Sequence, residues 1–169
     1  MGGKLGVDAT GKEVEDGVES LLLDKDLLEK MQEIDSNILE LKQYFTHTKN
    51  PICIILVNKV QSMQNIIAKL KPLEEHIRVL IITDKANNEI DNPYMLLWRV
   101  VNNIDAQRDV VLEPFIAIDG TNKSKLDGFN REWPKDTHCT KKVLDSLQER
   151  GLIDIDEKFI RKFGLLGFE

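Results

Sequence analysis

Short apolar runs alternate with amphipathic stretches through the middle of the chain, and this alternation constrains the fold most strongly. Ile52–Asn58 (ICIILVN) and Ile77–Asp84 (IRVLIITD) are continuously apolar and rich in β-branched residues, which is typical of strands buried on both faces. Asp109–Asp119 predicts one or two further strand segments around Pro114. With helices between the strands, the sequence predicts an α/β domain of three layers whose sheet is mainly parallel or mixed.

The segments between and after these runs have the spacing of helices. Val60–Leu70 carries an apolar face that ends before Pro72. The next helix is expected to begin at Pro93, the favoured first position, with Asn92 as its cap. Late in the chain, Thr140–Arg150 predicts a helix that ends at Gly151, and a final short helix and an apolar tail follow.

Residues 1–49 are expected to form a separate N-terminal part, and residues 50–169 the α/β domain. The first part begins with a loop rich in glycine and charge. From Asp26 to Phe45, apolar residues at three- and four-residue intervals predict one amphipathic helix. Its apolar stripe either docks on the chain's own core or binds a partner subunit. We expect this helix and the Phe-rich C-terminal tail to drive self-association into a homo-oligomer.

Composition limits the classes of function. The chain has 169 residues, is 41% hydrophobic and 31% charged, and carries a formal net charge of −6. The negative charge argues against general nucleic-acid binding, and no apolar run approaches the length of a membrane span. The opening residues lack the apolar stretch of a secretory signal, so the cytoplasm is the expected location. Cys53 and Cys139 are far apart in sequence, which argues against a zinc site or a disulfide framework.

One short motif occurs twice. Residues 7–12 read VDATGK and residues 118–123 read IDGTNK, so that Asp, Thr and Lys recur in register. An Asp at the end of a strand orders the following turn, and a Lys presents a cation to a phosphate or a carboxylate. In an open α/β sheet, ligands collect beyond the carboxyl ends of the strands. Asp8 and Asp119 are interpreted as organisers of these turns rather than as acids.

These motifs resemble signatures of the UbiD-type decarboxylases. GGKLGVDATGK, residues 2–12, is similar to the Asp-Ala-Thr signature near the end of that family. Residues 118–134, IDGTNKSKLDGFNREWP, resemble the same signature continued, with Gly120 in place of its Ala. Upstream, LLWRVVNNIDAQRDVVL resembles a recurrent helix-then-strand segment of the family. The likeness covers residues 77–150 in order and, separately, residues 2–12.

The resemblance implies a carboxy-lyase acting on aromatic or unsaturated acids in quinone biosynthesis, of the ubiquinone or menaquinone type; the futalosine-route menaquinone subfamily fits best. Such enzymes use prenylated FMN with a divalent metal, Mn or Mg, and potassium. Their catalytic residues and metal ligands lie in a central domain that has no counterpart in this sequence. We therefore expect a C-terminal fragment that binds no cofactor alone and contributes oligomerisation and active-site closure.

Several cationic residues are candidates for contacts with the anionic groups of the cofactor or substrate in the complete enzyme. They are Lys4, Lys12, Lys123, Lys125 and Arg131. The partners implied are the N-terminal and central domains of the same polypeptide. No catalytic or metal-binding residue is assigned to this chain.

Two other functions stay open. The chain could be a self-standing α/β binding or scaffolding module without catalytic activity. Alternatively, the adjacent His138 and Cys139 could serve an independent hydrolase, although neighbouring residues point in different directions and no residue that would orient them is identifiable. Trp98 is expected in the core, and Trp133 at the sheet edge or a domain contact.

Overall fold

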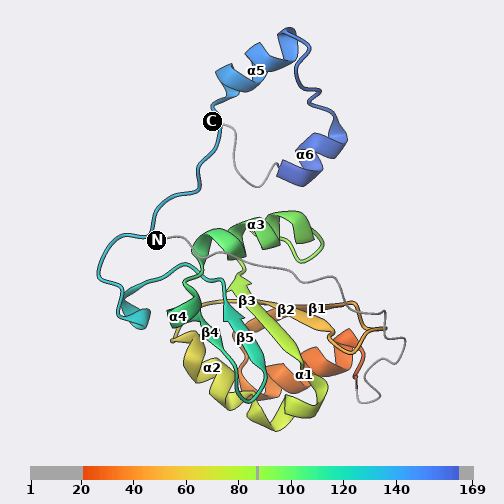
Figure 1. Ribbon diagram of the computed structural model, residues 1–169, viewed down its shortest axis with the longest axis vertical. Coiled ribbons are helices and arrows are strands. Elements are labelled where there is room, and N and C mark those ends of the chain that lie inside the picture. The colour runs from red at the N-terminus through yellow and green to blue at the C-terminus, as the bar shows by residue number, and fades with distance from the viewer. Residues whose placement is uncertain (1–20, 87, 164–169) are drawn as a thin grey trace.

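The computed structural model describes residues 21–86 and 88–163 of the chain. A five-stranded sheet with the strand order β1-β2-β3-β5-β4 forms its centre, and helices cover both faces (Figure 1). The strands are β1 (Ile38–Tyr44), β2 (Ile52–Val57), β3 (Val79–Asp84), β4 (Val110–Val111) and β5 (Ile116–Asp119). The α-helices are α1 (Asp24–Ile34), α2 (Met63–Lys69), α3 (Pro93–Asn103), α4 (Ala106–Asp109), α5 (Lys141–Glu149) and α6 (Glu157–Phe163). Two 3₁₀-helices complete the list, η1 (Lys71–His76) and η2 (Lys125–Asp127).

The sheet is parallel in the middle and antiparallel at its edges. β2, β3 and β5 run parallel, whereas β1 pairs antiparallel with β2 and β4 pairs antiparallel with β5. This confirms the predicted α/β domain with a mixed sheet. Val57 pairs with Asp84, and Ile82 pairs with Asp119, so the three parallel strands present their carboxyl ends at one edge of the sheet.

Alternate residues of the central strands are buried on opposite faces. Ile55 packs in the cluster beneath α1 and α2, and Leu56 packs in the cluster beneath α3; both are fully buried. Each such side chain stabilises the fold by about 1.5–3 kcal/mol relative to exposure. The continuous apolar run read from the sequence therefore reflects burial on both faces.

The helix predicted from Asp26 to Phe45 is wrong in its second half. α1 ends at Ile34, and the chain reverses before β1 begins at Ile38. At the reversal, Oδ1 of Asp35 accepts hydrogen bonds from the backbone N (3.0 Å) and the side-chain Nδ2 (2.9 Å) of Asn37. Short polar side chains that bond the local backbone compete with the helix, and here they end it.

The apolar stripe of α1 docks on the chain's own core. Leu27 and Met31 are fully buried in the cluster that also contains Ile38 of β1 and Ile55 of β2. The first of the two interpretations of this stripe is thus confirmed. These side chains are not available to a partner subunit, so the expectation that a continuous helix here drives self-association loses its basis.

The later helices begin and end close to the residues predicted from the sequence. Asn92 caps α3, because its side chain accepts a hydrogen bond from the backbone N of Met95 (3.2 Å), and Pro93 is the first helical residue. After α5, Gly151 adopts the left-handed conformation, with φ of 67°. α5 and α6 project beyond α3, away from the sheet (Figure 1). Among the described residues, none of the helices has the length and apolar character needed to cross a membrane.

Candidate functional site

Polar residues close each of the three parallel strands at the carboxyl edge of the sheet. Lys59 lies just beyond β2, Asp84 is the last residue of β3, and Asp119 is the last residue of β5. The chain leaves β2 toward α2 on one face and leaves β3 toward α3 on the other. A divergence of this kind is where ligands bind in open α/β sheets. The candidate site is therefore this edge, together with the segment that follows β5.

The turn after β5 is held by side chains of its own motif. Oδ1 of Asp119 accepts hydrogen bonds from the backbone N (3.0 Å) and the hydroxyl (2.5 Å) of Thr121. The backbone N of Asn122 donates to Oδ2 of Asp84 at 2.7 Å, which joins the turn to β3. Asp119 is thus a turn organiser, as the sequence predicted.

Lys123 lies at the centre of this turn, and its side chain is completely buried. Its Nζ lies 2.9 Å from Oδ2 of Asp119 and 3.4 Å from Oδ1 of Asp109, and it donates to the backbone O of Asp119 at 2.8 Å. Asp109 reaches this edge because β4, which follows it, runs antiparallel to β5. A buried ammonium with two carboxylate neighbours holds the turn closed.

Lys59 makes a second buried ion pair at the same edge. Its Nζ lies 2.6 Å from Oδ2 of Asp127, and their side chains are only 8% and 9% exposed. The same Nζ donates to the hydroxyl of Thr121 and to the backbone O of Asn122, both at 2.8 Å. Asp127 also accepts from the backbone N of Ser124 (2.9 Å), within the capping box that begins η2. The two ion pairs fix residues 119–127 as one unit.

Gly120 is required by close packing. A Cβ at this position would lie 2.6 Å from Cγ2 and 3.2 Å from Cα of Val100 on α3. The departure from the Asp-Ala-Thr signature therefore has a physical cause, since α3 leaves no room for the methyl group of Ala.

Two carboxylates at this edge have displaced pKa values, in opposite directions. Burial raises the pKa of Asp84, and the hydrogen bond from Asn122 and the nearby Lys59 only partly offset it. Burial also acts to raise the pKa of Asp109, but the guanidinium of Arg108, the backbone N–H of Asp105 and Lys123 outweigh it, so its pKa is lowered. Relative to an ordinary Asp, the environment of Asp84 shifts its titration toward the protonated form, and that of Asp109 toward the ionised form.

The predicted contact residues fall into three groups. Lys4 and Lys12 lie outside the described residues. Lys123 is enclosed by carboxylates of its own fold, in a position that favours a structural role. Lys125, in η2, and Arg131 are exposed; the Arg131 guanidinium lies 5.2 Å from the centre of the Phe129 ring. Contact of Lys123, Lys125 or Arg131 with a cofactor stays a prediction.

Sequence reasoning did not single out Lys59, Asp127 or the buried Arg99. The guanidinium of Arg99, on α3, donates from Nε (3.1 Å) and Nη2 (2.6 Å) to Oδ2 of Asp136 and from Nη1 to Oδ1 of Asn88 (3.0 Å). For Lys59 there was a usable signal, because it is a cation immediately after a predicted buried strand. Arg99 offered none, because a charged residue within an apolar helical segment is ordinarily assigned to solvent.

The geometry gives little support for a functional role of the other residues considered from the sequence. His138 and Cys139 are both exposed, and the ring Nδ1 of His138 lies 3.3 Å from the backbone O of Cys139. Trp98 and Trp133 are half-buried, and Trp133 packs edge-on against Phe129 with ring centres 5.1 Å apart. Within residues 21–86 and 88–163, no group of three or more His, Cys, Asp or Glu residues could hold a metal ion. These described residues therefore do not supply a ligand set for the divalent metal that the resemblance implies.

Comparison with known proteins supplies a structural relationship. The chain is similar to part of vanillic acid decarboxylase from Sedimentibacter hydroxybenzoicus, with a TM-score of 0.51. In the open form with truncated ShVdcD, the sequence identity is 16%, and the likeness covers 74% of this chain and 31% of that one. In the closed form the identity is 15%, with 76% of this chain and 31% of that one covered. The fold is UbiD-like. A UbiD-class enzyme, HmfF from Pelotomaculum thermopropionicum in an evolved dimeric form, gives a TM-score of 0.49 at 16% identity, covering 66% of this chain and 26% of that one.

Relatives in sequence are known as well. Two uncharacterized proteins of Helicobacter pylori, from strains 26695 and J99, are each 46% identical over 167 residues, which is 98% of this chain. The chain spans 27% of the length of these curated relatives. No protein-family model matches the sequence.

Proposed function

We propose that this chain is the C-terminal part of a UbiD-like carboxy-lyase that acts on aromatic or unsaturated carboxylic acids in quinone biosynthesis. In the complete enzyme it contributes subunit assembly and closure of the active site, and the chemistry takes place in domains that the chain lacks. The sequence signatures and the UbiD-like fold both support this proposal, as does the much greater length of the relatives that are 46% identical.

One observation supports the proposal that this chain closes the active site while other domains perform the chemistry. The Asp, Thr and Lys of the signature bind one another inside the fold, with Lys123 completely buried between Asp119 and Asp109. Groups engaged in this way cannot take up a proton or a phosphate during a reaction without breaking the turn. The signature therefore builds a rigid edge, from which the exposed Lys125 projects, and the exposed Arg131 follows in the next segment.

A rigid edge is useful to an enzyme whose site must be closed against water. Excluding water strengthens every charge interaction in the site, so a domain without a catalytic acid or base can still govern the rate. Prenylated FMN, a divalent metal and potassium would supply the decarboxylation chemistry when bound to the catalytic domain. The residues described here would cover that site and orient the cations at its rim.

The test uses the full-length Helicobacter pylori relative. Loaded with prenylated FMN, Mn²⁺ and K⁺, it is expected to release CO₂ from at least one member of a panel of aromatic and α,β-unsaturated acids. Deletion of the segment that matches this chain should abolish turnover while the remaining protein still binds the flavin. An intact protein that binds prenylated FMN but releases no CO₂ from any acid would contradict the enzymatic proposal. Flavin binding that is also absent would favour a self-standing binding or scaffolding module.

A further inference from the structure

Arg99 is a buried cation whose counter-charge comes from a distant part of the chain. Its side chain is 6% exposed, whereas that of Asp136 is 37% exposed. Among the described residues, Asp136 is the carboxylate within ion-pair distance of Arg99. On its other side, the guanidinium is held by Asn88, whose Nδ2 donates to the backbone O of Asp84 at 2.8 Å. The cation is thus anchored to the loop after β3.

Asp136 belongs to a segment, Phe129–Thr140, that contains no helix or strand and that we call the strap. The strap connects η2 to α5 and lies along α3. A small cavity of about 180 Å³ between the two is lined by Trp98, Arg99 and Asn102 of α3 and by strap residues from Trp133 to Thr137. Most strap residues are exposed, and within residues 21–86 and 88–163 the Arg99–Asp136 ion pair is the side-chain polar contact between the strap and the buried part of the fold.

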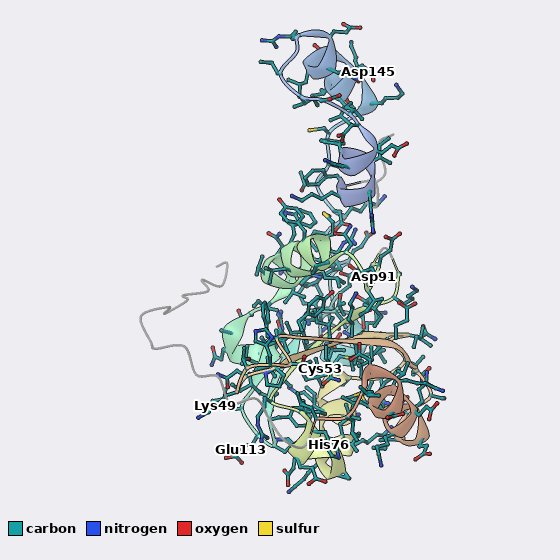
Figure 2. The ribbon with its side chains drawn as sticks, turned by 90° about the vertical axis from the view of Figure 1, so that its right-hand side faces the viewer. Lys49, Cys53, His76, Asp91, Glu113 and Asp145 are labelled. Atoms are coloured by element: carbon teal, nitrogen blue, oxygen red, sulfur yellow. The ribbon has the colours of Figure 1, made fainter. Side chains whose placement is uncertain are left out.

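The strap leads directly into α5 and borders a cavity shared with both C-terminal helices. A mostly apolar cavity of about 370 Å³ is lined by Trp98 of α3, His138 of the strap, Leu144 of α5 and Phe163 of α6. α6 touches α3 through the edge-on pair Tyr94–Phe163, with ring centres 5.6 Å apart. Figure 2 shows this helical part standing apart from the sheet, with Asp145 at its far end and Cys53 within the sheet. α6 also contacts α3 independently of the strap, because Nδ2 of Asn92 donates to the backbone O atoms of Arg161 (3.3 Å) and Lys162 (3.1 Å).

We propose that the strap is a closable element latched by Asp136, and that its opening uncovers the surface of α3 around Trp98 and Arg99. The physical basis is the cost of a buried charge: with the strap open, Arg99 would remain in the fold without its carboxylate. The cost of leaving the buried Arg99 without a counter-charge therefore favours the closed state. This inference rests on contacts within the chain and does not depend on the proposed decarboxylase function.

The test measures how fast an arginine-specific protease cuts the native 169-residue chain after Arg131, which is exposed within the strap. The substitution Asp136→Ala is expected to accelerate this cut about tenfold or more, and Asp136→Glu, which keeps the charge, should restore most of the protection. Asp145→Ala is the matched control, because Asp145 pairs with Lys141 on the exposed surface of α5. It should leave the rate unchanged.

Cutting after Arg78, which is exposed just before β3, distinguishes a local event from unfolding of the whole chain. Acceleration at Arg131 alone supports the latch. Equal acceleration at Arg78 and Arg131, or an Asp136→Ala rate equal to that of the unsubstituted chain, would overturn it. If Asp136→Ala alone does not fold, the double variant Arg99→Met with Asp136→Ala removes both charges; the latch predicts a folded core with fast cutting at Arg131, and slow cutting would overturn it.

Discussion

The Nζ of Lys123 lies 2.9 Å from Oδ2 of Asp119, its neighbour four residues earlier, and the lysine side chain has no exposure to solvent. Lys123, which was predicted to contact an anionic group of the cofactor or substrate, thus forms ion pairs inside the fold. Its second neighbour, Asp109, precedes the antiparallel edge strand β4, so one ion cluster links the β5 turn to the edge of the sheet.

Replacement of Lys123 with Met is expected to lower the free energy of unfolding by about 3–5 kcal/mol, because it leaves Asp119 and Asp109 buried with one cation fewer. The matched variant is Lys125→Met. Lys125 is exposed two residues later, so its loss should change stability by less than about 0.5 kcal/mol. Urea denaturation of both variants checks this difference, and equal effects would show that the Lys123 ion pairs contribute nothing.

Asp127→Asn is predicted to destabilise the chain by about 1–3 kcal/mol, because Lys59 loses a buried charged partner and η2 loses part of its capping box. Asp145→Asn removes the same charge from an exposed i,i+4 pair with Lys141 and should cost less than about 0.5 kcal/mol. Thermal unfolding at constant ionic strength compares the two. A larger loss for Asp145→Asn would contradict the assignment.

Gly120→Ala should destabilise the fold by about 1–3 kcal/mol, since the new methyl group would overlap Val100. Adding Val100→Ala should recover part of that loss, and Val100→Ala alone provides the control. The measurement is a double-mutant cycle in urea. Simple additivity of the two substitutions would mean that the close approach of α3 to Gly120 does not set the residue at this position.

Stability is predicted to respond to pH in opposite ways at Asp84 and Asp109. The folded-state pKa of Asp84 is raised by burial, so its ionised form costs stability at neutral pH. Asp84→Asn should therefore be more stable than the unsubstituted chain at pH 7. This advantage should shrink as the pH falls through the raised pKa and vanish below about 3.9, the ordinary value for Asp.

For Asp109, burial is outweighed by Arg108 and its other partners, and the folded-state pKa is lowered. The ionised carboxylate therefore stabilises the fold above a pH of about 3.9, and this contribution is lost as the pH falls through the lowered pKa. Asp109→Asn should be less stable than the unsubstituted chain at pH 7, with the difference narrowing in acid. Unfolding curves from pH 7 to pH 3 measure both variants, and differences of the same sign at pH 7 would contradict the assigned environments.

The sequence predicted the elements whose pattern is local and missed those that tertiary contacts decide. The strands around Ile55 and Ile82 were found because their apolar runs are continuous, and the start of α3 was found because Asn92 and Pro93 act through nearby backbone atoms. β1 was missed because Ile38 and Leu41 fit both a helical stripe and an edge strand. Only the reversal at Asp35 and the pairing with β2 distinguish the two.

In the candidate site, too, local contacts could be predicted from the sequence and tertiary contacts could not. Asp119 was recognised as a turn organiser because its partner, Thr121, is two residues away. Lys123 was placed among the candidate contacts because the sequence does not reveal that Asp109 reaches it across β4 and β5. Arg99 and Asp136 are separated by 37 residues, and only the path of the strap brings them together.

The most direct measurement of the proposed role is CO₂ release by the 169-residue chain itself, supplied with prenylated FMN, Mn²⁺, K⁺ and the same panel of acids. If the chain only closes and assembles a site formed by other domains, release will equal that of a blank without protein at every chain concentration. Release that rises in proportion to chain concentration would contradict the proposed role, because the chain itself would then have to contain catalytic groups.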